Sequence, residues 1–321
     1  MQSKNIILIT GSCGFIGFSV AKKLLEDGCN VLGIDSLNSY YDVNLKISRN
    51  KILQSSKSYH FLKMDLCDEG AVKKLFSDYS IKTVCHLAAQ AGVRYSLTHP
   101  LEYKKSNLDG FVNLIEEAKC ARVENFVYAS SSSVYGDNKI IPFAESLPCN
   151  QPVSLYGATK RANEIIAYSY SKLFNLPTTG LRFFTVYGPY GRPDMALFLF
   201  TRAILENKPI DVYNYGNMRR SFTYIDDIVS GVLSCLKKPF SYEIFNLGNN
   251  KSATLIEYIE TIEKKLGITA VKNMLPLQPG DVMATEADLT HVKEKIGFEP
   301  KTNIDAGVGK FVDWFRDYYK M

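Results

Sequence analysis

A tyrosine and a lysine in the middle of the chain have a spacing that suits acid–base chemistry. Tyr156 and Lys160 stand four residues apart in the segment YGATK, which places both on one face of a helix. A positive charge beside a phenol favours the phenolate and lowers a pKa that is ~10 in water, so Tyr156 is predicted to act as a general base toward a hydroxyl. Ser131, in YASSSSVYG, is predicted to hold the substrate oxygen and assist the proton transfer. The same spacing also occurs in ordinary pairs on a helix surface.

A glycine-rich turn near the start of the chain favours a phosphate-binding site. Gly11, Gly14 and Gly17 in GSCGFIG lie between a predicted strand and a predicted helix. Glycine is needed where the chain turns sharply, where backbone approaches a pyrophosphate and where a helix packs close to a strand. The N-terminus of the helix then offers free N–H groups and a partial positive charge to phosphates. Phe15 and Ile16, inside the same turn, are predicted to contact the cofactor.

An aspartate at the end of the second predicted strand favours NAD over NADP. Asp35 closes the run VLGID, where a carboxylate accepts hydrogen bonds from the adenosine ribose and repels a 2′-phosphate. A turn or helix cap is the alternative role for this residue. Asp65, a candidate contact of the adenine amino group, and the turn 87–89 also follow strands, although plain turn chemistry accounts for both. The remaining predicted cofactor contacts are Asn38, Leu66, Leu87, Ala88, Ala89 and Asn107.

The segments that carry these residues alternate between strand and helix patterns. Short apolar runs are typical of buried parallel strands, and the longer amphipathic segments between them are typical of helices. The first half of the chain therefore predicts a Rossmann-type, doubly wound α/β fold with helices on both faces of a parallel sheet. Strands are predicted at 5–10, 30–35, 59–66, 83–89, 125–131 and 177–184, and helices at 15–27, 71–79, 110–121 and 157–174.

The regular alternation ends after about residue 185. The stretch 186–195, VYGPYGRPDM, is loop-like, and a helix at 196–208 and a strand at 210–215 follow it. This shift predicts a smaller mixed α/β lobe that meets the ends of the parallel strands, where ligands of open α/β sheets usually bind. The predicted division is 1–180 for a dinucleotide-binding domain, with a returning segment about 222–248, and 181–321 mainly for substrate binding.

The composition argues against several other classes of protein. The 321 residues carry a net charge of +5, and lysine and arginine are scattered among acidic residues rather than gathered as in nucleic-acid-binding proteins. The seven cysteines include no CxxC pair, and the histidines show no metal spacing, so neither a disulfide framework nor a metal site is predicted. No apolar stretch approaches the ~20 residues of a membrane helix, and no signal-peptide cleavage region follows the start. A cytoplasmic protein without nucleic-acid or membrane partners is expected.

Five separated motifs give the chain a specific resemblance. The glycine turn, Asp35, SSSSVYG, SLYGATK and RFFTVYG together resemble the extended short-chain dehydrogenase/reductase family over essentially the whole chain. Within that family, DSLNSYYDVNLK, AAQAGVRYS, TVYGPYGRPDMALF and LQPGDVMATEAD are most similar to UDP-glucuronate 4-epimerases. The resemblance implies a bound NAD, oxidation at the sugar C4 with Tyr156 as the base, a turn of the 4-keto sugar about its diphosphate linkage, and reduction on its other face. It also implies a homodimer built on 110–119 and the helix of Tyr156.

Four residues bear on which sugar the resemblance implies. Family members that act on neutral hexoses or decarboxylate uronates usually carry Asn in place of Thr185, and dehydratases and decarboxylases carry Glu in place of Ser133. Two unpaired anions in a dry cleft would be costly, so the missing carboxylate suits a substrate that brings its own. Thr185, Ser132 and Ser133 would hold a C6 carboxylate together with Arg192, whose guanidinium binds carboxylates through two parallel bonds.

The resemblance also implies contacts to the nucleotide in the second lobe. Arg220 in RRSFTYIDD matches a phosphate-binding arginine, and Tyr213 would lie against the uracil. Gln278 and Asp281 in QPGD would contact phosphate or ribose, and many relatives have Arg in place of Gln278, which would weaken the contact here. Arg94 in AGVRYS is as consistent with a substrate contact as with a structural loop anchor.

Other functions fit parts of this pattern. The same fold serves 4-epimerases of UDP-glucose or UDP-N-acetylglucosamine and UDP-glucuronate decarboxylases. A non-catalytic NAD-sensing scaffold belongs to a different class, but such a protein would be expected to lose the Tyr156 and Lys160 pair that this chain keeps. The favoured prediction is NAD-dependent C4 epimerisation of a UDP-sugar, with UDP-glucuronate to UDP-galacturonate as the reaction.

Overall fold

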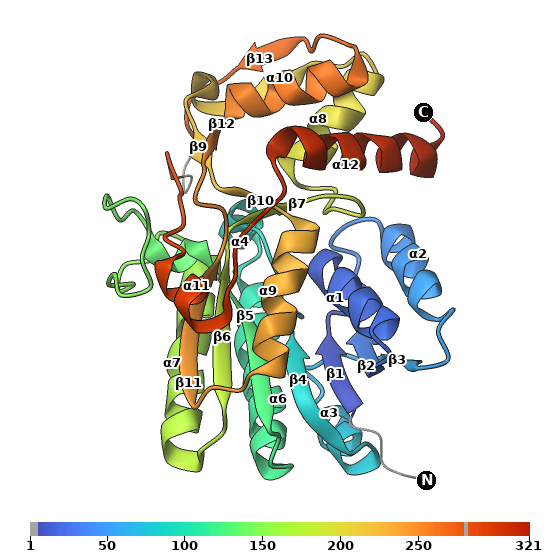
Figure 1. The fold of residues 1–321 in the computed structure, drawn as a ribbon, viewed down its shortest axis with the longest axis vertical. Coiled ribbons are helices and arrows are strands. Elements are labelled where there is room, and N and C mark those ends of the chain that lie inside the picture. The colour runs from blue at the N-terminus through green and yellow to red at the C-terminus, as the bar shows by residue number, and fades with distance from the viewer. Residues whose placement is uncertain (1–5, 279–281) are drawn as a thin grey trace.

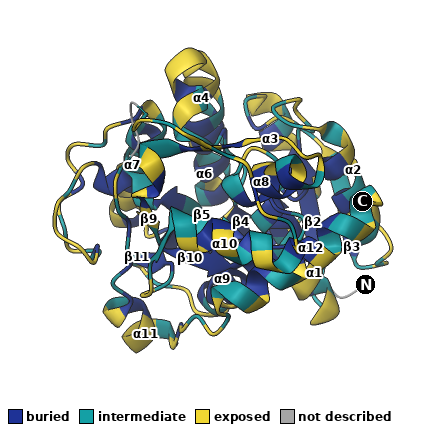
Figure 2. Cartoon of the chain, turned by 90° about the horizontal axis from the view of Figure 1, so that it is seen from above, coloured by how far each residue is buried: buried dark blue, intermediate teal, exposed yellow. Residues whose placement is uncertain are grey.

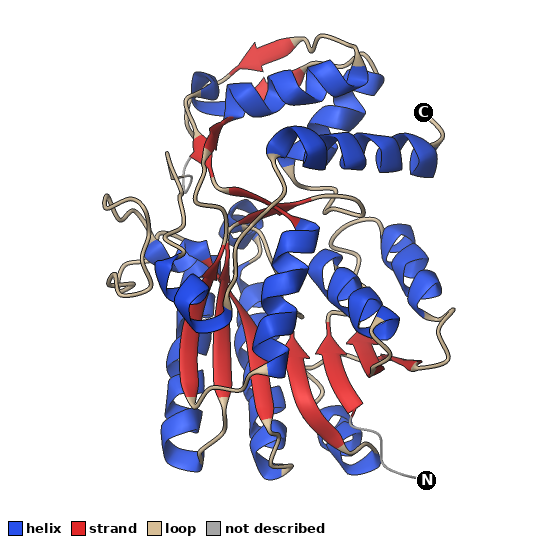
Figure 3. Cartoon of the chain, in the orientation of Figure 1, coloured by secondary structure: helices blue, strands red, loops and turns tan. Residues whose placement is uncertain are grey.

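A seven-stranded parallel sheet forms the centre of the protein (Figures 1 and 3). The computed structural model describes residues 6–278 and 282–321. The strand order is β11-β6-β5-β4-β1-β2-β3, and each neighbouring pair is parallel. The predicted Rossmann-type fold is therefore confirmed. The strands are β1 (Ile6–Thr10), β2 (Asn30–Asp35), β3 (Tyr59–Lys63), β4 (Ile81–His86), β5 (Asn125–Ser131), β6 (Thr178–Phe183) and β11 (Tyr242–Leu247).

Each face of the sheet has its own hydrophobic core. Successive strand residues point to opposite faces, so Leu8 of β1 packs in the cluster beneath α3 and α6, whereas Ile9 packs in the cluster beneath α1 and α9. Both faces are buried, which is why the strands read as continuous apolar runs. Seen from above, buried residues gather along these strands (Figure 2). The helices are α1 (Phe15–Glu26), α2 (Val43–Leu53) and α9 (Ile225–Lys237) on one side, and α3 (Glu69–Asp78), α6 (Gly110–Cys120) and α7 (Leu155–Phe174) on the other.

A smaller lobe lies beyond the carboxyl ends of the strands (Figure 1). Its helices α8 (Ala196–Leu205), α10 (Leu255–Leu266) and α12 (Ile304–Tyr319) pack around aromatic side chains, and the rings of Phe198 and Phe315 are 5.0 Å apart. Short strand pairs complete the lobe: β7 (Thr185–Tyr187) with β10 (Phe222–Tyr224), β8 (Ile210–Val212) with β13 (Lys272–Met274), and β9 (Arg219–Arg220) with β12 (Ala253–Thr254).

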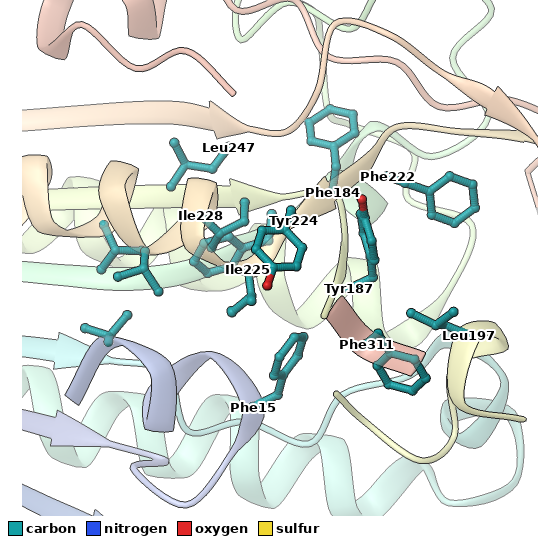
Figure 4. Packing of buried hydrophobic residues seen from close by; sticks show 14 of the residues in the cluster. Phe15, Phe184, Tyr187, Leu197, Phe222, Tyr224, Ile225, Ile228, Leu247 and Phe311 are labelled. Atoms are coloured by element: carbon teal, nitrogen blue, oxygen red, sulfur yellow. The ribbon is translucent and has the colours of Figure 1, made fainter. Parts of the chain in front are cut away.

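One continuous core joins the sheet to the second lobe. Phe15 of α1 and Ile225 of α9 belong to the same cluster as Phe222 and Phe311, which lie in the second lobe (Figure 4). The chain also returns from that lobe to the sheet, because α9 packs on α1 and β11 pairs in parallel with β6. A short helix, α11 (Thr290–Ile296), packs against β11. None of the helices in residues 6–278 and 282–321 is long and apolar enough to cross a bilayer.

Several segments differ from the expectation drawn from the sequence, and two of them have a clear physical cause. The strand predicted at 210–215 ends at Val212, because Asn214 and Tyr215 take left-handed backbone angles (φ 49° and 51°) within a short 3₁₀ turn. No helix is predicted at 43–53, where α2 forms. The buried positions of α2 include Lys46 and Arg49, so the apolar stripe that marks an amphipathic helix is interrupted. Further short helices are α4 (Val93–Thr98), α5 (Pro100–Tyr103), the π-helical stretch Lys104–Asp109 and the 3₁₀ turn Ser132–Tyr135.

Candidate active site

A cavity of about 1130 Å³ lies where the strand ends meet the second lobe. The turns after β1 to β5 form one wall, and the loop before α8, α8 itself and β8 form the other. This is the edge at which open parallel sheets bind their ligands. Its volume exceeds the roughly 300–1,000 Å³ of a typical pocket for one small molecule, so a cofactor and a substrate fit together.

Most of the predicted site residues line this cavity, although they come from distant parts of the chain. They are Gly11, Gly14, Phe15, Ile16, Gly17, Asp35, Asn38, Asp65, Leu66, Leu87, Ala88, Ala89, Arg94, Ser131, Ser132, Ser133, Tyr156, Lys160, Thr185, Arg192, Tyr213 and Arg220.

The glycine turn is packed so closely that side chains would not fit. A Cβ atom on Gly17 would lie 2.1 Å from the carbonyl oxygen of Gly11, and one on Gly11 would lie 2.8 Å from the backbone nitrogen of Ala88. Gly11 also has a positive φ of 67°. Helix α1 begins directly after Gly14 with no side chain capping its first turn, so its N–H groups face the cavity. This backbone cradle fits the pyrophosphate of a dinucleotide.

Asp35 is held at the end of β2 by backbone amides. Its two carboxylate oxygens accept hydrogen bonds from the amides of Cys13, at 3.1 Å, and Leu37, at 2.8 Å. Each oxygen has a second lone pair, which leaves Asp35 able to accept the hydroxyls of a ribose. Lys46 of α2 steadies the neighbouring turn by donating to both oxygens of Asn38. These residues fit the adenosine end of NAD.

Asn107, which was expected to contact the cofactor, lies behind the wall of the cavity. Its side chain accepts a hydrogen bond from the amide of Gln90 and donates to the carbonyl of Gln90 and the hydroxyl of Thr159. Asn163 donates in turn to the backbone carbonyl of Asn107. Asn107 is buried, and these bonds tie the turn after β4 to α7. Asn107 therefore holds the turn after β4 against α7 here, and its predicted contact with the cofactor stays a prediction.

Helix α7 and strand β5 bring the three predicted catalytic residues together. The hydroxyl of Ser154 caps α7 by accepting from the amide of Gly157 at 3.0 Å, so Tyr156 lies in the first turn and Lys160 one turn later. Lys160 is buried and donates to the backbone carbonyl of Ala129 at 2.9 Å. Ser131 ends β5, within hydrogen-bonding reach of Tyr156.

The pKa values of this group differ from the expectation. Burial raises the pKa of Tyr156, and the groups that act against this rise are the hydroxyl of Ser131 and the charge of Arg192, not Lys160. Burial also lowers the pKa of Lys160 to about 8. Lys160 is not among the groups that lower the pKa of Tyr156 here, and its ammonium donates to the carbonyl of Ala129, so its predicted effect on the phenol stays a prediction.

The residues predicted to bind the sugar lie around Tyr156. Ser132 and Ser133 begin the 3₁₀ turn after β5, Thr185 begins β7, and Arg192 projects from the loop before α8. Arg192 is not isolated, because Asp194 pairs with it through two short contacts. The cavity wall therefore offers three hydroxyl groups and a guanidinium that is already shared with a carboxylate.

On the nucleotide side, Arg94 and Tyr213 meet across the cavity. The Arg94 guanidinium carbon lies 4.6 Å from the centre of the Tyr213 ring, so a residue after β4 contacts the second lobe. Arg220 lines the cavity and donates to the carbonyl of Met283. Gln278 is not among the described residues that line the cavity, and Asp281 lies outside the described part of the chain.

Several residues of the site have no counterpart in the sequence-based prediction. The hydroxyl of Tyr40 donates to the carboxylate of Asp194 at 2.9 Å. Arg49 is fully buried and donates both to the carbonyl of Cys13 in the glycine turn and to that of Tyr190 in the loop before α8. Asp194 and Tyr190 lie more than a hundred residues along the chain from Tyr40 and Arg49, so no local sequence pattern indicates these contacts. No cluster of three or more His, Cys, Asp or Glu placed to hold a metal occurs in the described residues.

Comparison with known proteins agrees with this geometry. The model of the NAD dependent epimerase/dehydratase family matches residues 7–248. Protein CapI of Staphylococcus aureus is 49% identical, with 98% of this chain and 99% of that protein covered. A probable UDP-glucuronate 4-epimerase of Rhizobium meliloti (strain 1021) is 43% identical, with 98% and 97% covered.

Solved structures are similar over the same length. UDP-glucuronic acid 4-epimerase from Bacillus cereus, in complex with UDP-glucuronic acid and NAD, is 34% identical with a TM-score of 0.93, covering 98% of this chain and 100% of that one. UDP-glucose 4-epimerase from Thermotoga maritima, with UDP-glucose, is 30% identical with a TM-score of 0.88, covering 98% and 99%. The chain therefore belongs to the NAD dependent epimerase/dehydratase family and is an NAD-dependent epimerase.

Proposed function

We propose that the chain interconverts UDP-glucuronate and UDP-galacturonate by epimerisation at C4. The observation that carries the proposal is the wall beside Tyr156, where Ser132, Ser133, Thr185 and Arg192 supply hydroxyl and guanidinium donors. Donors of this kind suit a C6 carboxylate. The relatives named as UDP-glucuronate 4-epimerases support the same substrate.

Different residues of the chain have different roles in the proposed reaction. NAD bound in this cavity would supply the acceptor, and afterwards the donor, of a hydride at C4 of the sugar. Tyr156 takes the proton from the 4-hydroxyl and later gives it back, while Ser131 stabilises the phenolate by hydrogen bonding. Lys160 and Asp35 bind the cofactor, the first near the catalytic tyrosine and the second at the adenosine ribose.

The hydroxyl groups near the sugar also have a protective role in this proposal. Oxidation at C4 turns a uronate into a β-keto acid, which loses carbon dioxide when its C5–C6 bond aligns with the carbonyl π system. Short, fixed donors such as Thr185 and Ser133 hold the carboxylate away from that alignment. Epimerisation then proceeds without loss of carbon dioxide.

Two further properties are proposed on separate grounds. Helices α6 and α7 pack side by side and leave Val112, Ile165 and Tyr168 exposed at 39%, 53% and 48%. Such an apolar face suits a second copy of the chain, giving a homodimer through four helices. All seven cysteines are unpaired, which fits a reducing compartment such as the cytoplasm.

The deciding experiment incubates the purified protein with NAD and UDP-glucuronate and follows the products by NMR. UDP-galacturonate is expected. A UDP-pentose product would instead indicate a decarboxylase, and turnover of UDP-glucose or UDP-N-acetylglucosamine alone would indicate a neutral-sugar epimerase. No turnover of any nucleotide sugar would leave an NAD-sensing scaffold. Tyr156→Phe is the matched control, since it should still bind NAD but lose turnover by about 10²–10⁴-fold.

A further inference from the structure

The guanidinium of Arg192 is clamped by the carboxylate of Asp194. Arg192 Nε lies 3.1 Å from Asp194 Oδ1, and Nη2 lies 2.6 Å from Oδ2, which is a two-bond ion pair. The hydroxyl of Tyr40 donates to the same Oδ2 at 2.9 Å. The loop after β2, on the cofactor side, is thereby tied to the loop before α8, on the sugar side.

This three-residue network forms part of the cavity wall. Arg192, Asp194 and Tyr40 all line the cavity. Gly92 makes room for the network, because a Cβ atom there would lie 2.8 Å from the Tyr40 hydroxyl and 3.7 Å from Nη2 of Arg192. The side chains of Arg192 and Asp194 are 23% and 32% exposed, so water screens the pair only in part. Arg192 is also near enough to Tyr156 for its charge to act on the phenol.

Asp194 reduces the attraction that Arg192 exerts on an anion. A sugar carboxylate that reaches the remaining N–H groups of Arg192 meets a cation whose charge is already shared with a second carboxylate. Its binding is weaker than it would be at an unpaired arginine. In an enzyme that only had to bind a uronate, this arrangement would lower the affinity for the substrate without any benefit.

An epimerase has a second requirement, and here the argument rests on the proposed function. The 4-keto sugar must rotate inside the cavity before its other face can be reduced. Its carboxylate therefore has to leave the position that it occupies beside Arg192 when UDP-glucuronate first binds. Tight binding of the carboxylate in its initial position would lower KM without accelerating the rotation of the sugar. We propose that Asp194, held by Tyr40, is a specificity-determining residue that shares Arg192 with the substrate and keeps the sugar carboxylate releasable.

The variant Asp194→Asn tests this proposal because it removes the charge and keeps the size and one oxygen acceptor. The Kd and KM for UDP-glucuronate are expected to fall by about three- to ten-fold, since one repulsive charge is lost and Arg192 is freed. The kcat is expected to fall by a comparable factor, with reduced NAD accumulating in its ultraviolet absorbance during turnover. The Kd of UDP-glucose, which has no carboxylate, is expected to change by less than about two-fold.

Two further variants make the result decisive. Asp194→Ser, which is smaller and also uncharged, must move KM and kcat in the same directions even if Asp194→Asn folds poorly. Asp78→Asn changes the net charge equally, but Asp78 lies exposed on α3 and pairs with Lys74 away from the cavity, so both constants should stay unchanged. A rise in KM for UDP-glucuronate, or an equal change in UDP-glucose affinity, would show that Asp194 only orients Arg192 and would overturn the proposal.

The wild-type assay separates this inference from the proposed function. If the wild type fails to convert UDP-glucuronate, the proposed function fails, whatever the variants do. If the wild type converts it and the Asp194 variants behave like the wild type, only the inference about Asp194 fails.

Discussion

The ammonium group of Lys160 donates a hydrogen bond of 2.9 Å to the backbone carbonyl of Ala129. Ala129 lies on β5 two residues before Ser131, so this bond fastens α7, which carries Tyr156, to the strand that ends in Ser131. One turn further along α7, Glu164 accepts a hydrogen bond of 2.6 Å from the hydroxyl of Ser130. Two successive residues of β5 thus fix the position of α7, which keeps Tyr156 within reach of Ser131.

Lys160→Met is expected to abolish epimerase activity and to remove a pH-dependent cost of burying the ammonium, while it also loses the bond to Ala129. Burial lowers the pKa of Lys160 from 10.5 to about 8, so the charged amine costs the folded state up to about 3 kcal/mol below pH 8. Between pH 8 and 10.5 the unfolded chain still holds a proton that the folded chain has released, so wild-type stability rises with pH there. Urea unfolding at pH 7 and pH 10 should therefore show the wild type gaining stability relative to the variant as the pH rises. A gap that does not depend on pH would contradict this account.

Glu164→Gln is expected to destabilise the fold by about 3–5 kcal/mol, because it leaves a buried charge on Arg182 without its anion. Glu164 is fully buried and Arg182 nearly so, and two bonds of 2.9 Å join them. Ser130→Ala is the matched control, with an expected loss of about 1 kcal/mol because the ion pair remains. Denaturant unfolding of the three proteins measures both effects, and equal losses would argue against a dominant ion pair.

The same ion pair predicts a loss of stability in acid. Burial alone would raise the pKa of Glu164, but its bonds to Arg182 and Ser130 hold the pKa below the ordinary value of 4.5. A carboxyl with a lowered pKa stabilises the fold above its unfolded pKa and loses that contribution as the pH falls through its folded pKa. Below about pH 4.5 the wild type should therefore approach the stability of Glu164→Gln, as thermal unfolding across pH 3–7 would reveal.

Thr185→Ala is expected to increase the yield of UDP-pentose from UDP-glucuronate. Loss of the hydroxyl removes one of the groups proposed to hold the C6 carboxylate out of line with the C4 carbonyl. Product ratios measured by NMR report the change directly. Thr185→Ser keeps the hydroxyl and should stay close to the wild type, whereas a pentose yield that is equally low in both variants would remove the support for this role.

Ile165→Glu is expected to convert the proposed homodimer into a monomer. Ile165 is 53% exposed on α7, and a charge there would be buried without a partner when two copies meet. Sedimentation or light scattering of the variant and the wild type measures the change in mass. Leu277→Glu is a suitable control, because Leu277 is also exposed but lies in the second lobe, after β13. A wild type that is already monomeric would contradict the proposal.

The parts of this protein that were predictable from sequence depend on local patterns. The predicted strand at 125–131 coincides with β5 because a continuous apolar run marks a strand buried on both faces. Gly14 and Gly17 were recognisable because a Cβ atom on either would meet the carbonyl oxygen of Gly11 in the same tight turn. In each case the physical cause acts within a few residues, so the sequence records it.

The parts that were missed depend on contacts between distant segments. The buried face of helix α2 includes the charged residues Lys46 and Arg49, which donate hydrogen bonds to backbone carbonyls of other loops. The sequence of α2 therefore lacks the apolar stripe of a buried helix. Asp194 and Tyr40 are 154 residues apart in the sequence, and the residues around them give no indication that their side chains are in contact. The orientation of Lys160 toward Ala129 likewise depends on how α7 docks on β5. Contacts of this kind can be identified only from the folded structure.

The return of α9 and β11 to the sheet limits how this architecture can be rebuilt. A chimaera joined near residue 180 would pack the sheet and α1 of one protein against the edge strand β11 and the helix α9 of another, so the two halves of one apolar core would come from different sequences. The segment after residue 180 is therefore not an independent unit that can be exchanged between relatives. New substrate preferences in this scaffold are expected to arise through single replacements along the cavity wall, while the interleaved backbone stays the same.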